Sequence, residues 1–120
     1  MRKSDVSKYV RKWKKRLYLQ DWEIKTVICK QEDIDGCLAR ASIVGERRSC
    51  TISISWPHTN KSGELDDLEH SVVHELVHCW FDPFYPADPV RHKHKVLVLE
   101  NAVDAIAMAL VEADRKGSIQ

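Results

Sequence analysis

The sequence predicts an α+β fold in the order helix, three strands, helix, helix. Three observations support this prediction. Two long segments in the second half carry apolar residues at helical spacing, and three short segments in the first half have the composition and turn signals of strands. A basic segment with its own apolar stripe at helical spacing precedes the strands. The chain of 120 residues has the length of one domain, which we expect to span residues 1–120.

Composition places the chain among ordinary water-soluble proteins. Apolar residues make up 43% and charged residues 31%, and the net charge of +1 gives no overall bias toward nucleic acid. The sequence has no apolar run of about twenty residues. No short hydrophobic segment follows the basic N-terminus. We therefore expect neither a membrane span nor a secretory signal, and a cytoplasmic location.

The first predicted helix begins at Ser4 or Asp5, either of which can cap it, and runs to about Tyr18. One of its faces is apolar and carries Val6, Tyr9, Val10, Trp13 and Leu17. The other is strongly basic, because eight Lys or Arg fall within the first 16 residues. We interpret this as a solvated outer face; the alternative is a surface that attracts phosphates or an acidic partner.

Three strands are predicted next, separated by turns at residues 33–36 and 45–47. They cover Trp22–Ile28, Leu38–Val44 and Cys50–Trp56. The third alternates cleanly, so Cys50, Ile52, Ile54 and Trp56 should share one face, and Thr51, Ser53 and Ser55 should face water. The four cysteines, Cys29, Cys37, Cys50 and Cys79, form no Cys-x-x-Cys pair, and we expect free thiols unless the protein is exported.

The helix predicted over Leu65–Phe81 carries the most informative motif, His74-Glu75-Leu76-Val77-His78. Two histidines four residues apart lie on one face of a helix, and two neutral imidazoles can hold a zinc ion there. Glu75 is then placed to take a proton from a metal-bound water. The chemistry predicted is hydrolysis. His70 extends the row by one turn, but a His70/His74 pair would offer ligands without an adjacent base.

A third ligand is predicted in the helix over Val90–Arg115. Glu100 and Asp104 lie one turn apart in a stretch that is otherwise mostly apolar. Carboxylates among buried neighbours are rarely tolerated unless they are paired or bind metal. We expect Glu100 to be a metal ligand and Asp104 to accept a hydrogen bond from the outer nitrogen of a zinc histidine. The alternative is a polar stripe that faces solvent.

The motif His74-Glu75-x-x-His78 followed by Glu100-x-x-x-Asp104 resembles the paired signature of the gluzincins, the thermolysin-like zinc metallopeptidases. The short chain is most similar to their minimal single-domain members, the minigluzincins. The resemblance implies a zincin-like fold with a mixed β-sheet, an active-site helix and a C-terminal glutamate helix. It also implies Zn²⁺ held by His74, His78 and Glu100, with Glu75 as general base and Asp104 orienting His74.

The same resemblance places the second strand, around Ala39-Arg40-Ala41-Ser42, at the sheet edge above the cleft, where it would bind an extended peptide. The alternative is an interior strand whose alanines admit close helices. Tyr85, His92 and His94 are candidates for stabilising the oxyanion of the reaction. The larger family members add a C-terminal subdomain that closes the cleft. This chain has no room for one, so a weak or latent enzyme is expected.

Two other functions fit the sequence. In a SprT-like protease acting near DNA, His92 or His94 would replace Glu100 as the third ligand. In a non-catalytic, zinc-stabilised binding module, the basic first helix would contact nucleic acid. We favour the peptidase, with a peptide or protein as its substrate.

Overall fold

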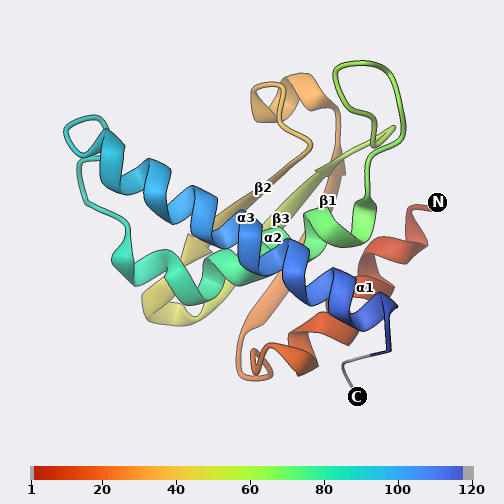
Figure 1. Ribbon diagram of the computed structural model, residues 1–120, viewed down its shortest axis with the longest axis horizontal. Helices are drawn as coiled ribbons and strands as arrows, with labels where there is room; N and C mark the ends of the chain where they lie inside the picture. Colours follow the sequence, from red (N-terminus) through yellow and green to blue (C-terminus); the bar gives the residue numbers. More distant parts are fainter. Residues whose placement is uncertain (1, 118–120) are drawn as a thin grey trace.

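The computed structural model describes residues 2–117 and has the predicted order of elements (Figure 1). Its helices are α1 (Ser4–Arg16), α2 (Leu68–Phe81) and α3 (Lys93–Arg115), and its strands are β1 (Glu23–Cys29), β2 (Ala39–Val44) and β3 (Ser49–Ser55). Short 3-10 helices cover Gln31–Ile34, Gly45–Arg47 and Asp82–Phe84. The α+β class predicted from the sequence is confirmed.

The three strands form a mixed sheet with the order β1-β3-β2. β1 runs parallel to β3, and β2 runs antiparallel to it. The mixed sheet is therefore confirmed, and β2 is an edge strand. The alternative prediction, that Ala39 and Ala41 belong to an interior strand, is wrong. Both alanines lie on the face of β2 that packs against the core, so their small side chains allow α2 to come close to this edge.

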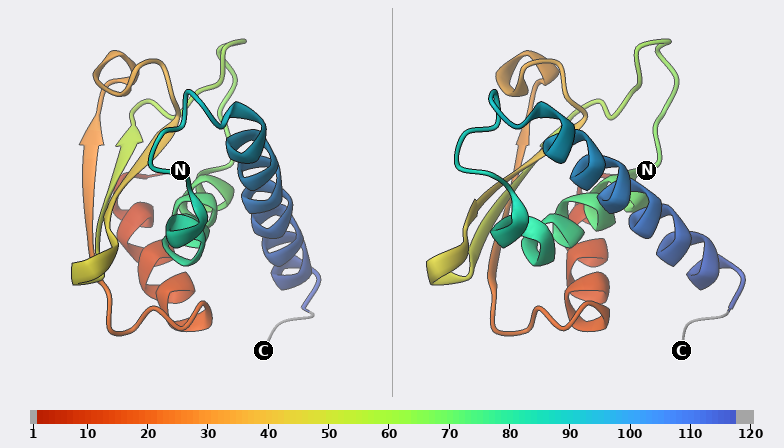
Figure 2. Two further views of the ribbon diagram at one scale, coloured as in Figure 1. Left: turned by 90° about the vertical axis from the view of Figure 1, so that its left-hand side faces the viewer. Right: turned by 60° about the vertical axis from the view of Figure 1, so that its left-hand side comes forward.

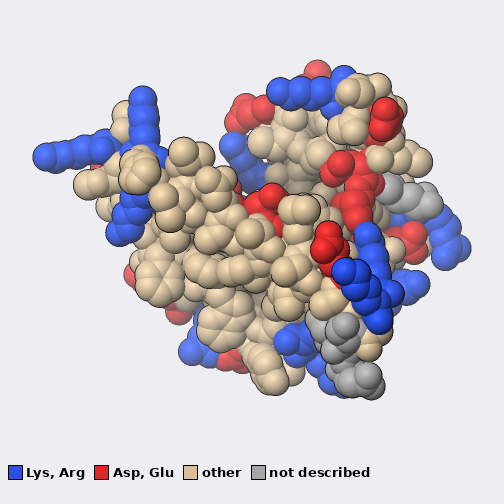
Figure 3. All heavy atoms as spheres, in the orientation of Figure 1, with Lys and Arg blue, Asp and Glu red and all other residues tan. Residues whose placement is uncertain are grey.

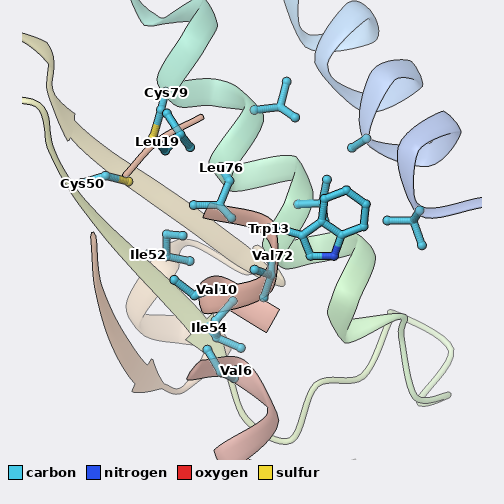
Figure 4. Close-up of a cluster of buried hydrophobic side chains, with 14 of the residues drawn as sticks. Val6, Val10, Trp13, Leu19, Cys50, Ile52, Ile54, Val72, Leu76 and Cys79 are labelled. Carbon is cyan, nitrogen blue, oxygen red and sulfur yellow. The ribbon is translucent and has the colours of Figure 1, made fainter. Parts of the chain in front are cut away.

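The molecule has three layers (Figure 2). The sheet forms one side, α1 and α2 lie against it, and α3 packs on α2 from the other side. The core fills the space between β3 and the two inner helices (Figure 4), and its members include Val6, Val10, Trp13, Cys50, Ile52, Ile54, Val72 and Leu76. Burial of this apolar surface is the main force that holds α2 to the sheet.

The prediction that Ser55 faces water is wrong. Thr51 and Ser53 are partly exposed, as expected, but Ser55 is fully buried. Ser55 is the last residue of β3, and the buried His58 ring donates from Nδ1 to the Ser55 carbonyl at 3.3 Å. Alternation predicts which way a side chain points, but it does not predict how the chain packs at this last residue of the strand.

α2 begins at Leu68 rather than at the predicted Leu65. The carboxylate of Asp67 accepts a hydrogen bond from the backbone N–H of His70 at 3.1 Å and caps the helix. Leu65 instead forms an isolated β-bridge with Thr59. The bridge between Thr59 and Leu65 and the cap at Asp67 therefore set where α2 begins.

The ends of the other two helices also differ from the prediction. α1 ends at Arg16, because Tyr18 has a left-handed backbone with φ of 57°. α3 begins at Lys93 rather than Val90, because the Asp88 side chain accepts the N–H of Arg91 and holds a turn there. None of the helices within residues 2–117 is both long enough and apolar enough to cross a membrane.

The basic face of α1 is not simply solvated, as the sequence analysis expected. Lys12 contacts Glu69 of α2 at 2.8 Å and Asp114 of α3 at 2.7 Å, and Arg16 also pairs with Asp114. The indole N–H of Trp13 donates to the same Glu69 carboxylate at 2.7 Å. On the face shown in Figure 3, Lys and Arg side chains are spread around the rim and form no continuous patch. The ion pairs of Lys12 and Arg16 therefore link α1 to α2 and α3.

His58 fastens the loop before α2 to that helix, and its stability contribution should depend on pH. Its Nδ1 donates to the Ser55 carbonyl at 3.3 Å, which leaves Nε2 to accept from the Ser71 hydroxyl at 2.9 Å. Burial lowers the pKa of His58 below its ordinary value of 6.5. A lowered histidine pKa means that this contribution is complete above the unfolded pKa and is lost as the pH falls below it.

We expect His58→Leu to lower the free energy of unfolding by about 1–3 kcal/mol at pH 8, because two buried partners lose their hydrogen bonds. At pH 5 the difference in unfolding free energy between variant and wild type should be smaller, because below the unfolded pKa protonation of His58 favours the unfolded wild type. Urea denaturation of both proteins at the two pH values, with a chelator present, measures this. An equal gap at both values would contradict the assigned role.

Candidate metal centre

α2 places the two histidines of the motif on its face toward α3. His74 and His78 are one turn apart, and their ring centroids are separated by 5.1 Å. Their side chains are 21% and 15% exposed, so each ring is largely shielded but still reaches solvent. Glu75 is 8% exposed. The helix therefore presents two imidazoles side by side with a buried carboxylate next to them.

α3 brings Glu100 to the same point. Its Oε2 lies 3.6 Å from Nε2 of His78. One ligand atom from each of His74, His78 and Glu100 lies within 4.8 Å of the other two. The structure thus brings together the three residues that the sequence analysis expected as ligands, across 22 to 26 positions of the chain.

The donor set fits zinc. Zinc binds imidazole nitrogen at about 2.0–2.1 Å and carboxylate oxygen at about 2.0–2.2 Å, and so a tetrahedral ion holds its ligands about 3.4 Å apart. The separation of 3.6 Å between His78 and Glu100 is close to that value. Two nitrogens and one oxygen from the protein also leave a fourth position for water, as in catalytic zinc sites.

The outer nitrogens of both histidines have partners. Asp104 Oδ1 lies 3.2 Å from Nδ1 of His74, and the Tyr85 hydroxyl lies 3.3 Å from Nδ1 of His78. A proton on each Nδ1 leaves the lone pair of each ring on Nε2. Burial lowers the pKa of His78, which keeps its ring neutral near pH 7. Both rings are thus oriented for a metal.

Tyr85 has a different position from the one expected of an oxyanion donor. Its hydroxyl donates to Oε1 of Glu100 at 2.5 Å while it contacts His78. Burial, followed by the Glu100 carboxylate, raises the pKa of Tyr85, so the hydroxyl keeps its proton as a donor. In this arrangement Tyr85 ties two of the three candidate ligands together.

The site opens into a cleft of about 540 Å³ between α2 and β2. Glu75 lies in its wall. Burial, followed by the charge of Glu100, raises the pKa of Glu75 to about 7, and the backbone N–H of Ala41 opposes this shift by favouring the charged form. A carboxylate with a pKa near 7 can both accept and return a proton at neutral pH.

The edge strand forms the other wall of the cleft. Ala39, Arg40 and Ala41 line it, whereas Ser42 is exposed and does not. Arg40 also pairs with Asp35 at 3.2 Å. Three further residues line the cleft that were not predicted as site residues, namely Cys37, Ile43 and Asp82. Ile43 continues the alternation of the alanines and Asp82 lies one turn beyond His78, so both positions carried a usable signal.

His92 and His94 lie outside the site. Both side chains are exposed at the start of α3, and neither lines the cleft or joins a cluster of metal-ligating groups found within residues 2–117. Of the three oxyanion candidates, only Tyr85 is in the cleft.

No family model, no curated protein and no solved structure matches this chain.

Proposed function

We propose that this protein is a zinc-dependent peptidase of the minimal gluzincin type, with a zincin-like fold. His74, His78 and Glu100 would hold the ion. The observation that supports this most strongly is the convergence of these three side chains from two helices, with their ligand atoms within 4.8 Å of one another and Glu75 in the wall of the same cleft. The hydrogen-bond partners of both outer nitrogens add to this support.

Each residue of the site would have a separate task. When bound, zinc would lower the pKa of a water toward about 7 and polarise the scissile carbonyl. Glu75 would accept the proton of that water and return it to the leaving amine. Asp104 would hold the ring of His74, and Tyr85 would hold His78 and Glu100. The free edge of β2 would bind the substrate backbone as an added antiparallel strand.

The alternatives have weaker support. A SprT-like site would need His92 or His94, and both are exposed outside the cleft. Nucleic-acid binding through α1 would compete with the ion pairs that Lys12 and Arg16 make to Glu69 and Asp114. We also expect slow turnover, because the Tyr85 hydroxyl is bonded to Glu100 and would have to leave it to stabilise an oxyanion.

Metal removal tests the proposal. After dialysis against zinc, the protein should carry about one ion per chain by elemental analysis and should cleave an unstructured peptide library. A strong chelator should abolish cleavage, and an equimolar addition of zinc should restore it. Cleavage that persists in the metal-free protein would show that the peptidase activity does not use this site.

A further inference from the structure

A second cluster of metal-ligating groups lies one turn along α2 from the first. It consists of His70, His74 and Asp104, whose ligand atoms all lie within 4.8 Å of one another. Asp104 Oδ1 is 3.2 Å from Nδ1 of His74 and 3.6 Å from Nε2 of His70. A tetrahedral zinc ion holds its ligands about 3.4 Å apart, so both separations suit an ion placed between these atoms.

The ring of His70 gives an independent reason to expect a ligand. Its Nε2 is buried and makes no hydrogen bond, since 3.6 Å to Asp104 is too long for one. Buried polar atoms are nearly always paired, and an unpaired one is often the mark of a bound ion or water. The other side chains at this end of the helix already have partners, such as Ser71 with His58.

The second cluster is also open to solvent. A cleft of about 250 Å³ is lined by His70, His74 and Asp104 together with Asp66. Asp104 is 49% exposed, so an ion can enter the cleft at this carboxylate and can complete its coordination with water, while His70 and His74 line the inner side of the same cleft. Two nitrogens and one carboxylate oxygen are donors that suit zinc and other divalent transition metals.

We propose that His70, His74 and Asp104 form a second binding site for a divalent cation. This site competes with the first site for the ion because both use His74 as a ligand. A neutral imidazole has one lone pair. When Nδ1 of His74 carries the proton and donates to Asp104, Nε2 serves the first cluster. When the ion binds Nδ1, that proton moves through water to Nε2, and the first cluster loses a ligand. The existence of the second site does not depend on the proposed function. The competition between the two sites does, because it assumes that the first cluster also binds zinc.

The second site should bind zinc more weakly than the first site. Within residues 2–117 the ring of His70 has no hydrogen-bond partner to orient it, whereas Tyr85 and Asp104 orient the ligands of the first cluster. Loss of such partners typically lowers metal affinity about 10- to 100-fold. Wild-type protein should therefore bind one zinc per chain, mostly at the first cluster.

A zinc titration against a chromogenic chelator tests this in the full chain. The double variant His78→Gln/Glu100→Gln should still bind one zinc, more weakly than the wild type. Adding His70→Gln should lower that remaining affinity at least about tenfold. His94→Gln, which removes an exposed imidazole of α3, is the matched control and should change nothing. Circular dichroism checks that each variant folds. If the double variant does not fold, His70→Gln is tested in the single variant Glu100→Gln instead.

Ring ¹⁵N NMR of His74 provides a second readout. Zinc should bind Nε2 in the wild type and Nδ1 in the double variant. The proposal is overturned if the double variant binds no zinc, or if His70→Gln leaves its affinity unchanged. The proposed function would survive that result as long as the wild type binds zinc tightly. Conversely, equal zinc affinity in wild type and double variant would show that His78 and Glu100 do not bind the ion. The first site would then be rejected and the second site retained.

Discussion

Replacing Glu75 with glutamine is expected to lower peptide cleavage by about 10²- to 10⁴-fold, the usual contribution of a general base, while zinc stays bound. Glutamine has nearly the same shape but cannot take a proton. It should not harm the fold, because burial and the charge of Glu100 already disfavour the charged form of Glu75. The measurements are kcat/KM on a peptide substrate and the zinc content of the same sample.

Glu46→Gln is a matched control for this variant. Glu46 is an exposed glutamate in the turn between β2 and β3, outside the cleft, so the same substitution there should leave cleavage unchanged. If Glu75→Gln cleaves as fast as the wild type, Glu75 is not the base. If it loses its zinc as well as its activity, the loss of cleavage reports on metal binding and says nothing about proton transfer.

The second large effect is expected on zinc affinity. Glu100→Gln should weaken zinc binding at the first cluster by about 100-fold or more, because a direct ligand matters at least as much as an outer partner. The amide can still accept the Tyr85 hydrogen bond, so the change is confined to the charge and the metal bond. Competition with a chelator of known affinity measures the loss.

His92→Gln and His94→Gln are the decisive comparison for this variant. Both histidines are exposed outside the cleft, and their replacement should leave zinc affinity within experimental error of the wild type. The opposite pattern, with zinc lost on replacing either histidine and kept in Glu100→Gln, would favour the SprT-like arrangement and reject Glu100 as the third ligand.

The site was predictable because helical geometry fixes relative positions over short distances. Spacing alone places His74 beside His78 and Glu100 beside Asp104. What spacing cannot give is the way two helices face each other. Carboxylates among apolar neighbours predicted Glu100 as a ligand and Asp104 as a partner of a zinc histidine, and the resemblance to gluzincins paired Asp104 with His74. The structure has Glu100 in contact with His78 and Asp104 in contact with His74.

Other features depend on contacts that no local pattern encodes. Lys12 pairs with Glu69 and Asp114, which lie 57 and 102 positions away in the chain. Because the sequence does not show these contacts, it predicted a solvated basic face for α1. The burial of Ser55 depends on packing at the end of β3, where the chain leaves the sheet and His58 bonds the Ser55 carbonyl. Tyr85 was a candidate for the site, but its bonds to Glu100 and His78 depend on the conformation of the loop between α2 and α3.

A crystal structure of the zinc-loaded protein, with the ion located by anomalous scattering at the zinc edge, tests the central claim most directly. We expect one dominant ion bound to Nε2 of His74, Nε2 of His78 and a carboxylate oxygen of Glu100, each at about 2.0–2.2 Å, with Glu75 unbound beside it. A dominant ion located anywhere else, or a Glu100 carboxylate that does not bind it, would contradict the proposal that this cleft is a zinc peptidase site.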